Sequence, residues 1–259
     1  MSESHSLAEL SLEEREELIK EWSALKKPQS LLRKVFETLG SSVAIGTSGQ
    51  LSGVTLIDMA AKTGLPFRVF CVDTLRLHES TYELWEHLEQ YYGIELEIYR
   101  AEDSQIERMI SQHGEHLFFD NRFKQEHCCN VRKVVPHREA LKSMVAWISG
   151  LRRDQSETRS ALPRCSEAEY ENRSLLKVSP LIEWDEEDVW AYVRKHDVPY
   201  DPLFDPRDDG SRYPSVGCVI CTTPILPHED TRAGRWRWFN DSEESHKKEC
   251  GIHFDAVKG

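Results

Sequence analysis

Short apolar runs alternate with helix-like stretches through the first 150 residues, and this alternation limits the fold more than any other feature. The runs at 42–46, 67–72, 94–99 and 145–149 have the composition of buried strands. Helix-like segments separate them, for example at 79–92. Strands joined by helices of ten or more residues are typical of βαβ units. The sequence therefore predicts an α/β fold built on a parallel sheet.

Two short helices are expected ahead of the first strand. Ser11 and Glu14 have the spacing of a capping box, and an amphipathic stretch follows to about Lys27. Pro28 is expected to stop this helix, since proline breaks a helix interior. A second helix is predicted over 31–39.

The pattern weakens after Gly150. A short strand is predicted at 175–178 and a helix at 185–196 with Asp185 as its N-cap, followed by a loop-rich stretch. Two further helices are expected earlier, at 104–112 and 130–142. The predicted organisation is an N-terminal helical segment (1–40), an α/β domain (41–240) and a mobile C-terminal tail (241–259).

Composition excludes several classes of function. The 259 residues carry 33 Lys and Arg against 45 Asp and Glu, a net charge of −12, which argues against a general nucleic-acid or membrane binder. No run approaches 18 apolar residues, and the N-terminus has no basic and apolar signal regions. We therefore expect a cytoplasmic protein. Its seven cysteines should be reduced, metal-bound or catalytic rather than paired.

The polar loops that follow the predicted strands mark a ligand site. Ligands of parallel sheets bind at the carboxyl ends of the strands. The loop 47–53 places Ser48 and Gly49 before a helix, where backbone N–H groups can hold a phosphate. Asp73 ends the next strand, and a third loop follows 147–149. This arrangement suggests a nucleotide site without selecting the chemistry.

Four cysteines form two close pairs. A C-x-x-C turn brings two thiolates to one metal, and four such sulfurs suit zinc or an iron–sulfur cluster. An adjacent pair is awkward for one small ion but can reach two irons of a larger cluster, so spacing alone leaves both metals open. The candidate ligands are Cys128, Cys129, Cys218 and Cys221.

The other three cysteines differ in context. Cys71 lies in an apolar strand and is expected in the core, whereas Cys165 is expected to be an incidental loop thiol. Cys250 follows Lys247 and Lys248, and nearby cations lower the pKa of a thiol and so raise its nucleophilicity. From the tail alone, an ordinary exposed cysteine is the simpler interpretation.

Several segments taken together resemble the iron–sulfur-containing adenylyl-sulfate (APS) reductases of the assimilatory sulfonucleotide reductase family. The match extends collinearly from about residue 40 to the end. The segments that carry it are the Cys-Cys pair with Arg132-Lys133 after it, CVDTLRLHESTYEL (71–84), GLRRDQSETRS (150–160), KVSPLIEW (177–184), YPSVGCVICTTPI (213–225), RAGRWRW (232–238) and KKECGIHF (247–254).

This resemblance implies an adenine nucleotide α-hydrolase-like (PP-loop-like) domain and a [4Fe–4S] cluster held by the four paired cysteines. It implies reduction of adenylyl sulfate to sulfite and AMP in sulfate assimilation. Cys250 would attack the sulfate sulfur to give an S-sulfocysteine, and thioredoxin would release sulfite. It leaves the oligomeric state open, a homo-oligomer included.

The substrate of such a reaction is a phosphate–sulfate anhydride, which needs preorganised cations. The candidates are Lys133, Arg153, Arg232 and Arg235. Arg232 and Arg235 would share a face if their stretch is helical. Arg152, Arg164 and Arg237 are interpreted as ordinary surface ion pairs.

Two departures from the family pattern stand out. The loop TSGQLSG (47–53) lacks an acidic pair that is usual before the helix, which puts any inherited role of Ser52 and Gly53 in doubt. Leu75 stands where a glycine is usual.

Three alternatives remain. A phosphoadenylyl-sulfate (PAPS) or dual-substrate reductase has similar chemistry but typically lacks the paired cysteines. A PP-loop ATP pyrophosphatase, with a zinc site made of four cysteines, would need an Asp in the loop. A non-catalytic iron–sulfur redox sensor would leave the cations without a role.

Overall fold

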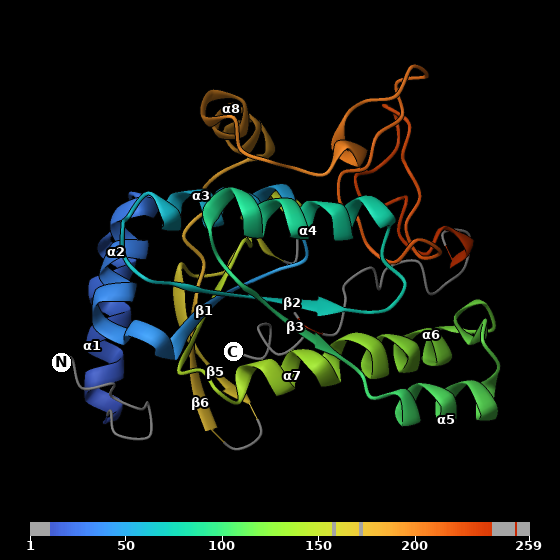
Figure 1. The fold of residues 1–259 in the computed structure, drawn as a ribbon, viewed down its shortest axis with the longest axis horizontal. Coiled ribbons are helices and arrows are strands. Elements are labelled where there is room, and N and C mark those ends of the chain that lie inside the picture. The colour runs from blue at the N-terminus through green and yellow to red at the C-terminus, as the bar shows by residue number, and fades with distance from the viewer. Residues whose placement is uncertain (1–10, 157–158, 171–172, 240–251, 253–259) are drawn as a thin grey trace. The chain divides into compact units, whose positions relative to one another are not determined.

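The predicted strands belong to a six-stranded sheet of order β3-β2-β1-β4-β6-β5. Figure 1 draws its strands as arrows among the helices. Its strands are β1 (Val43–Thr47), β2 (Arg68–Asp73), β3 (Leu96–Arg100), β4 (Ala146–Ser149), β5 (Cys165–Tyr170) and β6 (Arg173–Val178). β1 pairs in parallel with β2 and β4, and β4 with β6. The predicted α/β class with a mostly parallel sheet is confirmed.

The computed structural model describes residues 11–156, 159–170, 173–239 and 252. Within them the chain forms two compact units that alternate along the sequence. Unit 1 takes in 11–71, 85–97 and 140–200, and unit 2 takes in 72–84, 98–139 and the chain from 201. The division into segments 1–40, 41–240 and 241–259 stays a prediction.

The N-terminal helices are α1 (Leu12–Ala24) and α2 (Pro28–Leu39). The capping box is confirmed, because Ser11 Oγ accepts from Glu14 N at 3.2 Å and Glu14 accepts from Ser11 N at 2.6 Å. α1 ends earlier than predicted, at Ala24. Pro28 begins α2 instead of only stopping α1, since the first helical position needs no N–H bond and suits the fixed φ of proline.

Helix α3 (Leu51–Ala61) crosses the interior of unit 1 and is buried from Leu51 to Ala60. Its buried Asp58 accepts from Tyr92 Oη at 3.1 Å, Tyr192 Oη at 2.7 Å and Lys62 Nζ at 2.6 Å. A buried carboxylate is tolerated only when it is satisfied in this way. Asp58 thus joins α3 to the last residue of α4 (Glu79–Tyr92) and to the middle of α8 (Glu186–His196).

β5 was not predicted, and Cys165 is therefore not a loop thiol. The segment pairs antiparallel with β6 at the edge of the sheet, and Cys165 is buried there. Its sequence, CSEAEY, is too polar to read as a strand. Arg15 of α1 forms an ion pair with Glu167 at 3.1 Å, so α1 accounts for charged residues on this strand.

Unit 2 is built from helices and loops. Its helices are α5 (Asp103–His113), α6 (Arg122–Cys129) and a π-helix η4 (Asn130–Val134), which leads into α7 (Val135–Leu141). The predicted helix over 130–142 therefore starts earlier, at 122. The apolar core gathers Met109, Leu117, Phe118 and Cys128, with Cys221 and Trp238 against it. Short 3-10 helices complete the described chain: η2 (Gly40–Ser42), η3 (Leu117–Phe119), η5 (Arg153–Gln155), η7 (Pro202–Phe204) and η8 (Arg237–Phe239).

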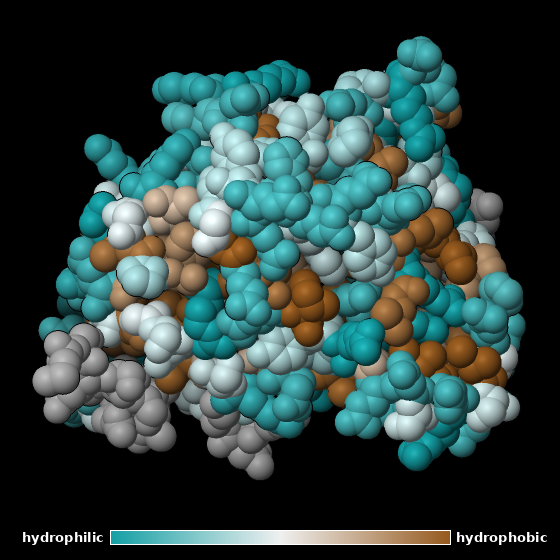
Figure 2. Space-filling model, in the orientation of Figure 1, coloured by the Kyte–Doolittle hydropathy of each residue, from teal (hydrophilic) through white to brown (hydrophobic). Residues whose placement is uncertain are grey.

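The surface view in Figure 2 shows brown hydrophobic residues scattered among hydrophilic ones on this face. Scattered exposed apolar side chains are normal for a folded protein. Among the described residues, no helix has the length and apolar character needed to cross a membrane.

Candidate functional site

The predicted phosphate loop of unit 1 lies between β1 and α3. Gly49 has a φ of 81°, and its N–H donates to Thr47 Oγ1 at 3.1 Å. A Cβ atom on Gly53 would lie 1.9 Å from Thr47 Oγ1, so only glycine fits there. Ser48 lies in the same turn. Because the N-terminus of a helix carries unpaired N–H groups and positive dipole charge, this strand–turn–helix suits an anion.

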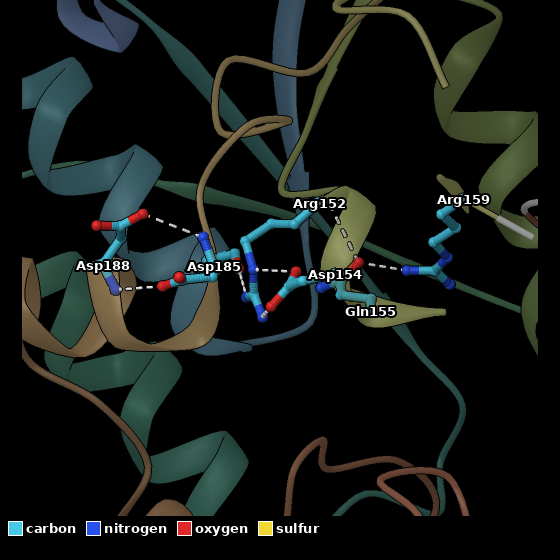
Figure 3. A network of polar contacts seen from close by, with 7 residues as sticks. Arg152, Asp154, Gln155, Arg159, Asp185 and Asp188 are labelled. Atoms are coloured by element: carbon cyan, nitrogen blue, oxygen red, sulfur yellow. Dashed lines mark hydrogen bonds and ion pairs between the residues drawn. The ribbon is translucent and has the colours of Figure 1, made fainter. Parts of the chain in front are cut away.

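A buried arginine contacts the first turn of α3, and Figure 3 shows the contacts of this Arg152 with Asp154 and Gln155. Arg152 is 8% exposed, and its Nη1 donates to Ser52 Oγ at 2.6 Å. Its Nε and Nη2 donate to the two carboxylate oxygens of Asp154 at 2.9 and 3.0 Å. The interpretation of Arg152 as a surface ion pair was therefore wrong, because the side chain is directed inward to a hydroxyl of the phosphate loop.

Arg153, a predicted substrate-binding residue, lies beside this network in unit 1. Its Nε donates to the carbonyl of Leu162 at 3.0 Å, and its Nη1 is 4.0 Å from Glu183. Glu183 also pairs with the buried Arg164 at 2.7 Å. Arg164 was expected at the surface, but it is buried. Arg153 keeps a partly exposed head.

The adjacent cysteines of unit 2 lie where helix α6 widens into the π-helix. Pro136 has no N–H, and its ring disturbs the i to i−4 hydrogen bonds of the helix next to it. The N–H of Val135 instead donates to Asn130 O, five residues back, which is the bond of a π-helix. Cys128 is buried, and Cys129 Sγ accepts from Gln125 Nε2 at 3.1 Å. The wide turn thus presents two consecutive thiols and the two basic residues after them.

The second cysteine pair lies in a tight turn. Cys221 N donates to Cys218 O at 2.9 Å, so the C-x-x-C folds back as predicted. Thr74 Oγ1 lies 3.3 Å from Cys218 Sγ, and Arg132 Nη1 donates to Thr74 O at 3.0 Å. These contacts link the loop after β2 to the C-x-x-C turn and to the π-helix that follows Cys129.

Burial and mutual repulsion act on these thiols. The pKa of Cys221 is raised to about 12, mainly by burial and further by Cys218 and Cys128, while Arg235 and Lys133 oppose the shift. Burial also raises the pKa of Cys128, while Arg132 and Arg76 counteract it. Three of the four predicted ligand sulfurs therefore lie within electrostatic range of one another, surrounded by four cations.

The donor chemistry of this cysteine cluster (Cys128, Cys129, Cys218 and Cys221) fits an iron–sulfur group. Hydrogen bonds to the sulfurs, such as those of Gln125 and Thr74, are a common way of tuning such groups. Within the described part of the chain, however, no three Cys, His, Asp or Glu side chains are close enough to form a ready ligand set.

The stretch with Arg232 and Arg235 is a turn and not a helix. Arg235 N donates to Arg232 O at 3.0 Å, and Arg235 pairs in a bridge with Thr222. Arg235 Nη1 donates to Thr222 Oγ1 at 2.7 Å, and a Cβ on Gly217 would lie 2.1 Å from that nitrogen. Arg235 is thereby held beside the C-x-x-C turn, and the condition for a shared helical face with Arg232 is not met.

Asp73, at the end of β2, shapes the following turn. Its Oδ1 accepts from Leu75 N and from Tyr82 Oη, both at 2.7 Å. Leu75 has a φ of 57°, a conformation in which glycine is at ease and other residues are strained. The observed role of Asp73 is thus to fix a turn whose neighbour, Thr74, contacts Cys218.

The predicted residues fall into two groups, one in each unit. Unit 1 contains Ser48, Gly49 and Arg153, and unit 2 contains Asp73, Lys133, Arg232, Arg235 and the cysteine cluster. Cys250 lies outside the described residues. Cys71 is fully buried in β2 as predicted, where burial strongly raises its pKa.

Three residues near these sites were not singled out from the sequence. Ser52 was set aside because an acidic pair was missing, and Thr74 and Arg76 lie in a loop without a spacing signal. Arg76 contacts Glu115 O at 3.1 Å and the ring of Phe118 at 5.1 Å. Only their place after predicted strands could have suggested them.

Comparison with known proteins gives a consistent family. Residues 42–224 match the phosphoadenosine phosphosulfate reductase domain. The chain is 40% identical over 223 residues to adenosine 5'-phosphosulfate reductase of Allochromatium vinosum, covering 86% of this chain and 82% of the relative. It is 36% identical over 232 residues to the enzyme of that name in Pseudomonas aeruginosa, covering 88% and 82%.

Solved structures agree with the fold. A phosphoadenylyl-sulfate (PAPS) reductase from Candida auris, crystallised as a phosphate complex, aligns with a TM-score of 0.66 and 29% identity. It covers 86% of this chain and 100% of its own. An FMN adenylyltransferase from Candida glabrata aligns with a TM-score of 0.52 over 83% of this chain and 73% of the neighbour's chain. At 11% sequence identity, this is a likeness of fold alone.

Proposed function

This chain belongs to the phosphoadenosine phosphosulfate reductase family, and we propose that it reduces adenylyl sulfate (APS) to sulfite and AMP in sulfate assimilation. Relatives named adenosine 5'-phosphosulfate reductase, matched over most of both chains, support this substrate. The observation that carries the proposal is the gathering of two distant cysteine pairs and four basic residues within unit 2.

The cysteine cluster would hold a [4Fe–4S] group. When bound, such a group would tie the two cysteine pairs together and place its own charge among Arg76, Arg132, Lys133 and Arg235. The raised thiol pKa values fit this assignment, because neighbouring thiolates are stable only when a metal compensates their charge.

The first chemical step would belong to Cys250. Its thiolate would attack the sulfate sulfur of APS, so that an S–S bond forms while the bond from sulfur to the phosphate oxygen breaks. AMP leaves with the electron pair of that bond, and the enzyme carries an S-sulfocysteine. Lys133, Arg153, Arg232 and Arg235 would supply the positive charge that stabilises the sulfate and phosphate oxygens, and Ser48 and Gly49 would hold phosphate oxygens.

Thioredoxin, kept reduced in the cytoplasm, would complete the reaction. One of its thiolates attacks Cys250 Sγ, and sulfite leaves with the S–S electron pair. The second thiol then resolves the mixed disulfide, regenerating Cys250 and giving oxidised thioredoxin. The two electrons that convert the sulfate sulfur to sulfite therefore come from the dithiol. The segment 241–259, which carries Cys250, serves both partners in turn under this scheme.

A PAPS reductase is the second candidate, and the Candida auris structure supports it through the fold. Four cysteines in two pairs favour APS, because PAPS reductases of this family typically lack them. A PP-loop ATP pyrophosphatase is less favoured, because the loop TSGQLSG has no Asp to help hold magnesium.

The decisive experiment measures sulfite release from APS and from PAPS, together with the iron, sulfide and zinc content of the purified protein. We expect iron and sulfide, little zinc, and faster turnover of APS. In the Cys250→Ser variant, sulfite release should vanish while iron content and AMP binding are retained. Cys71→Ser is the matched control for a thiol without a catalytic role, provided that it folds. Near-normal turnover by Cys250→Ser, or a colourless zinc protein, would reject the scheme.

A further inference from the structure

Ser52 is buried at the first turn of α3, with 3% of its surface exposed. A Cβ on Gly150 would lie 2.8 Å from its Cβ, so glycine allows the loop after β4 to pass directly against it. Arg152, two residues further along that loop, donates from Nη1 to Ser52 Oγ at 2.6 Å. The hydroxyl is therefore held between two segments that are 100 residues apart in sequence.

The direction of the hydrogen bond between Arg152 and Ser52 follows from the chemistry of the two groups. A guanidinium has only N–H donors and no acceptor, so Ser52 Oγ accepts and its own proton is directed elsewhere. Within the described part of the chain, no acceptor is recorded for that proton. A serine in a helix often donates to a carbonyl three or four residues back, but among the described residues no such bond is found here.

Arg152 is itself fixed in two ways. Asp154 accepts from Nε and Nη2 in a bidentate pair, which sets the plane of the guanidinium (Figure 3). Gln155 Oε1 accepts from the backbone N–H of Arg152 at 3.2 Å and from Arg159 Nη1. The carboxylate of Asp154 largely neutralises the charge of Arg152. The main effect of Arg152 on Ser52 is therefore to orient the hydroxyl group.

We propose that Arg152 is a positioning residue that orients Ser52, and that the Ser52 hydroxyl donates a hydrogen bond to a phosphate oxygen of the nucleotide. This inference rests on the proposed function and adds a binding residue to it. Ser52 lies in the loop stretch that lacks the usual acidic pair, so no carboxylate there competes with a phosphate. A hydrogen bond donated to the hydroxyl oxygen polarises the O–H bond toward an acceptor, and the N-terminus of α3 favours an anion there.

Binding of AMP and adenosine tests this inference, because only AMP carries the phosphate. Ser52→Ala should weaken AMP binding about tenfold, the usual loss when one hydrogen bond to a charged group is removed, and leave adenosine binding unchanged. In turnover, KM for APS should rise while kcat changes little, since the contact is made before and during the reaction. Ser111→Ala, at an exposed serine of α5, is the matched control and should change neither ligand.

The role of Arg152 is tested by a double-mutant cycle. Arg152→Lys keeps the charge but cannot hold Asp154 and Ser52 together, so AMP binding should fall several-fold. Adding Ser52→Ala to it should cause no further loss, because both variants remove the same oriented donor. Thermal denaturation establishes that each variant is folded, and Asp154→Asn provides a second route if Arg152→Lys is not.

Two results would overturn the inference: unchanged AMP binding in Ser52→Ala, or equal losses for AMP and adenosine. Additive effects of the two variants would remove the positioning role of Arg152. These failures differ from failure of the proposed function, in which the wild-type protein itself would bind no AMP and release no sulfite from APS.

Discussion

The phosphate loop of unit 1 and the cysteine cluster of unit 2 are built in different ways. In unit 1 a strand, a turn and a buried helix fix the loop, and neutral or paired groups such as Thr47, Ser52 and Arg152 satisfy one another. In unit 2 the thiols lie at the end of α6 and in a tight turn, where burial raises the pKa of Cys128 and Cys221 and Cys218 adds to both shifts. In the first region most polar groups find partners within the chain, whereas the second would be completed by the proposed cluster.

Metal removal should separate the two regions most strongly. Chelation of iron from the anaerobic protein is expected to abolish sulfite release, because the proposed cluster that joins the two cysteine pairs would be lost. Amide exchange over 122–134 and 216–223 should then accelerate by more than about 100-fold, while 43–61 should change little. Hydrogen-exchange mass spectrometry measures both in one sample, so that 43–61 is an internal control. Equal acceleration in the two regions would contradict the comparison.

The same difference explains what the sequence could predict. Hydrophobic periodicity predicted most strands, and most helices between them, to within a few residues, because the burial of apolar side chains determines where these elements form. It missed β5, a polar edge strand whose charges are paired with α1, and it placed Arg152 at the surface although Ser52 and Asp154 bury it.

The cysteine cluster could be proposed from motif spacing alone, but its surroundings could not. Thr74 and Arg76 come from a loop that is distant in sequence, and no local pattern links them to Cys218 or Cys128. The spacing of Arg232 and Arg235 left the local structure of that stretch open, and the bridge between Arg235 and Thr222 accompanies a turn there. Long-range contacts decide such positions, and a single sequence does not contain them.

Two glycines allow the regions to be disturbed one at a time. Gly53→Ala places a methyl group 1.9 Å from Thr47 Oγ1, and we expect a loss of about 1–3 kcal/mol in stability with weaker AMP binding. Gly217→Ala forces Arg235 away from Thr222, and kcat/KM for APS should fall about tenfold. Iron content should stay normal in Gly53→Ala.

Denaturant unfolding, AMP titration and iron analysis are done on both variants, so that each variant is the control for the other region. The comparison fails if Gly53→Ala loses iron while Gly217→Ala keeps full activity.

Leu75 tests strain in the loop that contacts the cysteine cluster. A β-branched residue is disfavoured at its φ of 57°, so Leu75→Ile should lower stability by about 1 kcal/mol. Leu226→Ile is a matched control, because the two leucines are equally exposed, at 40% for Leu226 and 41% for Leu75. They differ in that Leu226 has no positive φ. Leu75→Gly should be close to neutral, since relief of strain offsets the greater freedom of the unfolded chain. Urea unfolding midpoints measure all three, and equal losses at the two leucines would remove the argument for strain.

The smallest effect is expected at an ion pair of unit 2 close to the arginine turn. The hydrogen bond from Arg237 lowers the pKa of Glu229 to about 2, helped by the N–H of Leu226. A carboxylate with a lowered pKa stabilises the fold above its unfolded value, near 4.5, and loses this effect as pH falls toward 2. At pH 7 Glu229→Gln should lower the Tm by no more than about 2 °C, because exposed pairs contribute little. The difference in Tm between wild type and variant should shrink steadily below pH 4.5 and should be smaller in high salt. A difference that persists unchanged at pH 2 would show that Glu229 acts through shape and not through its charge.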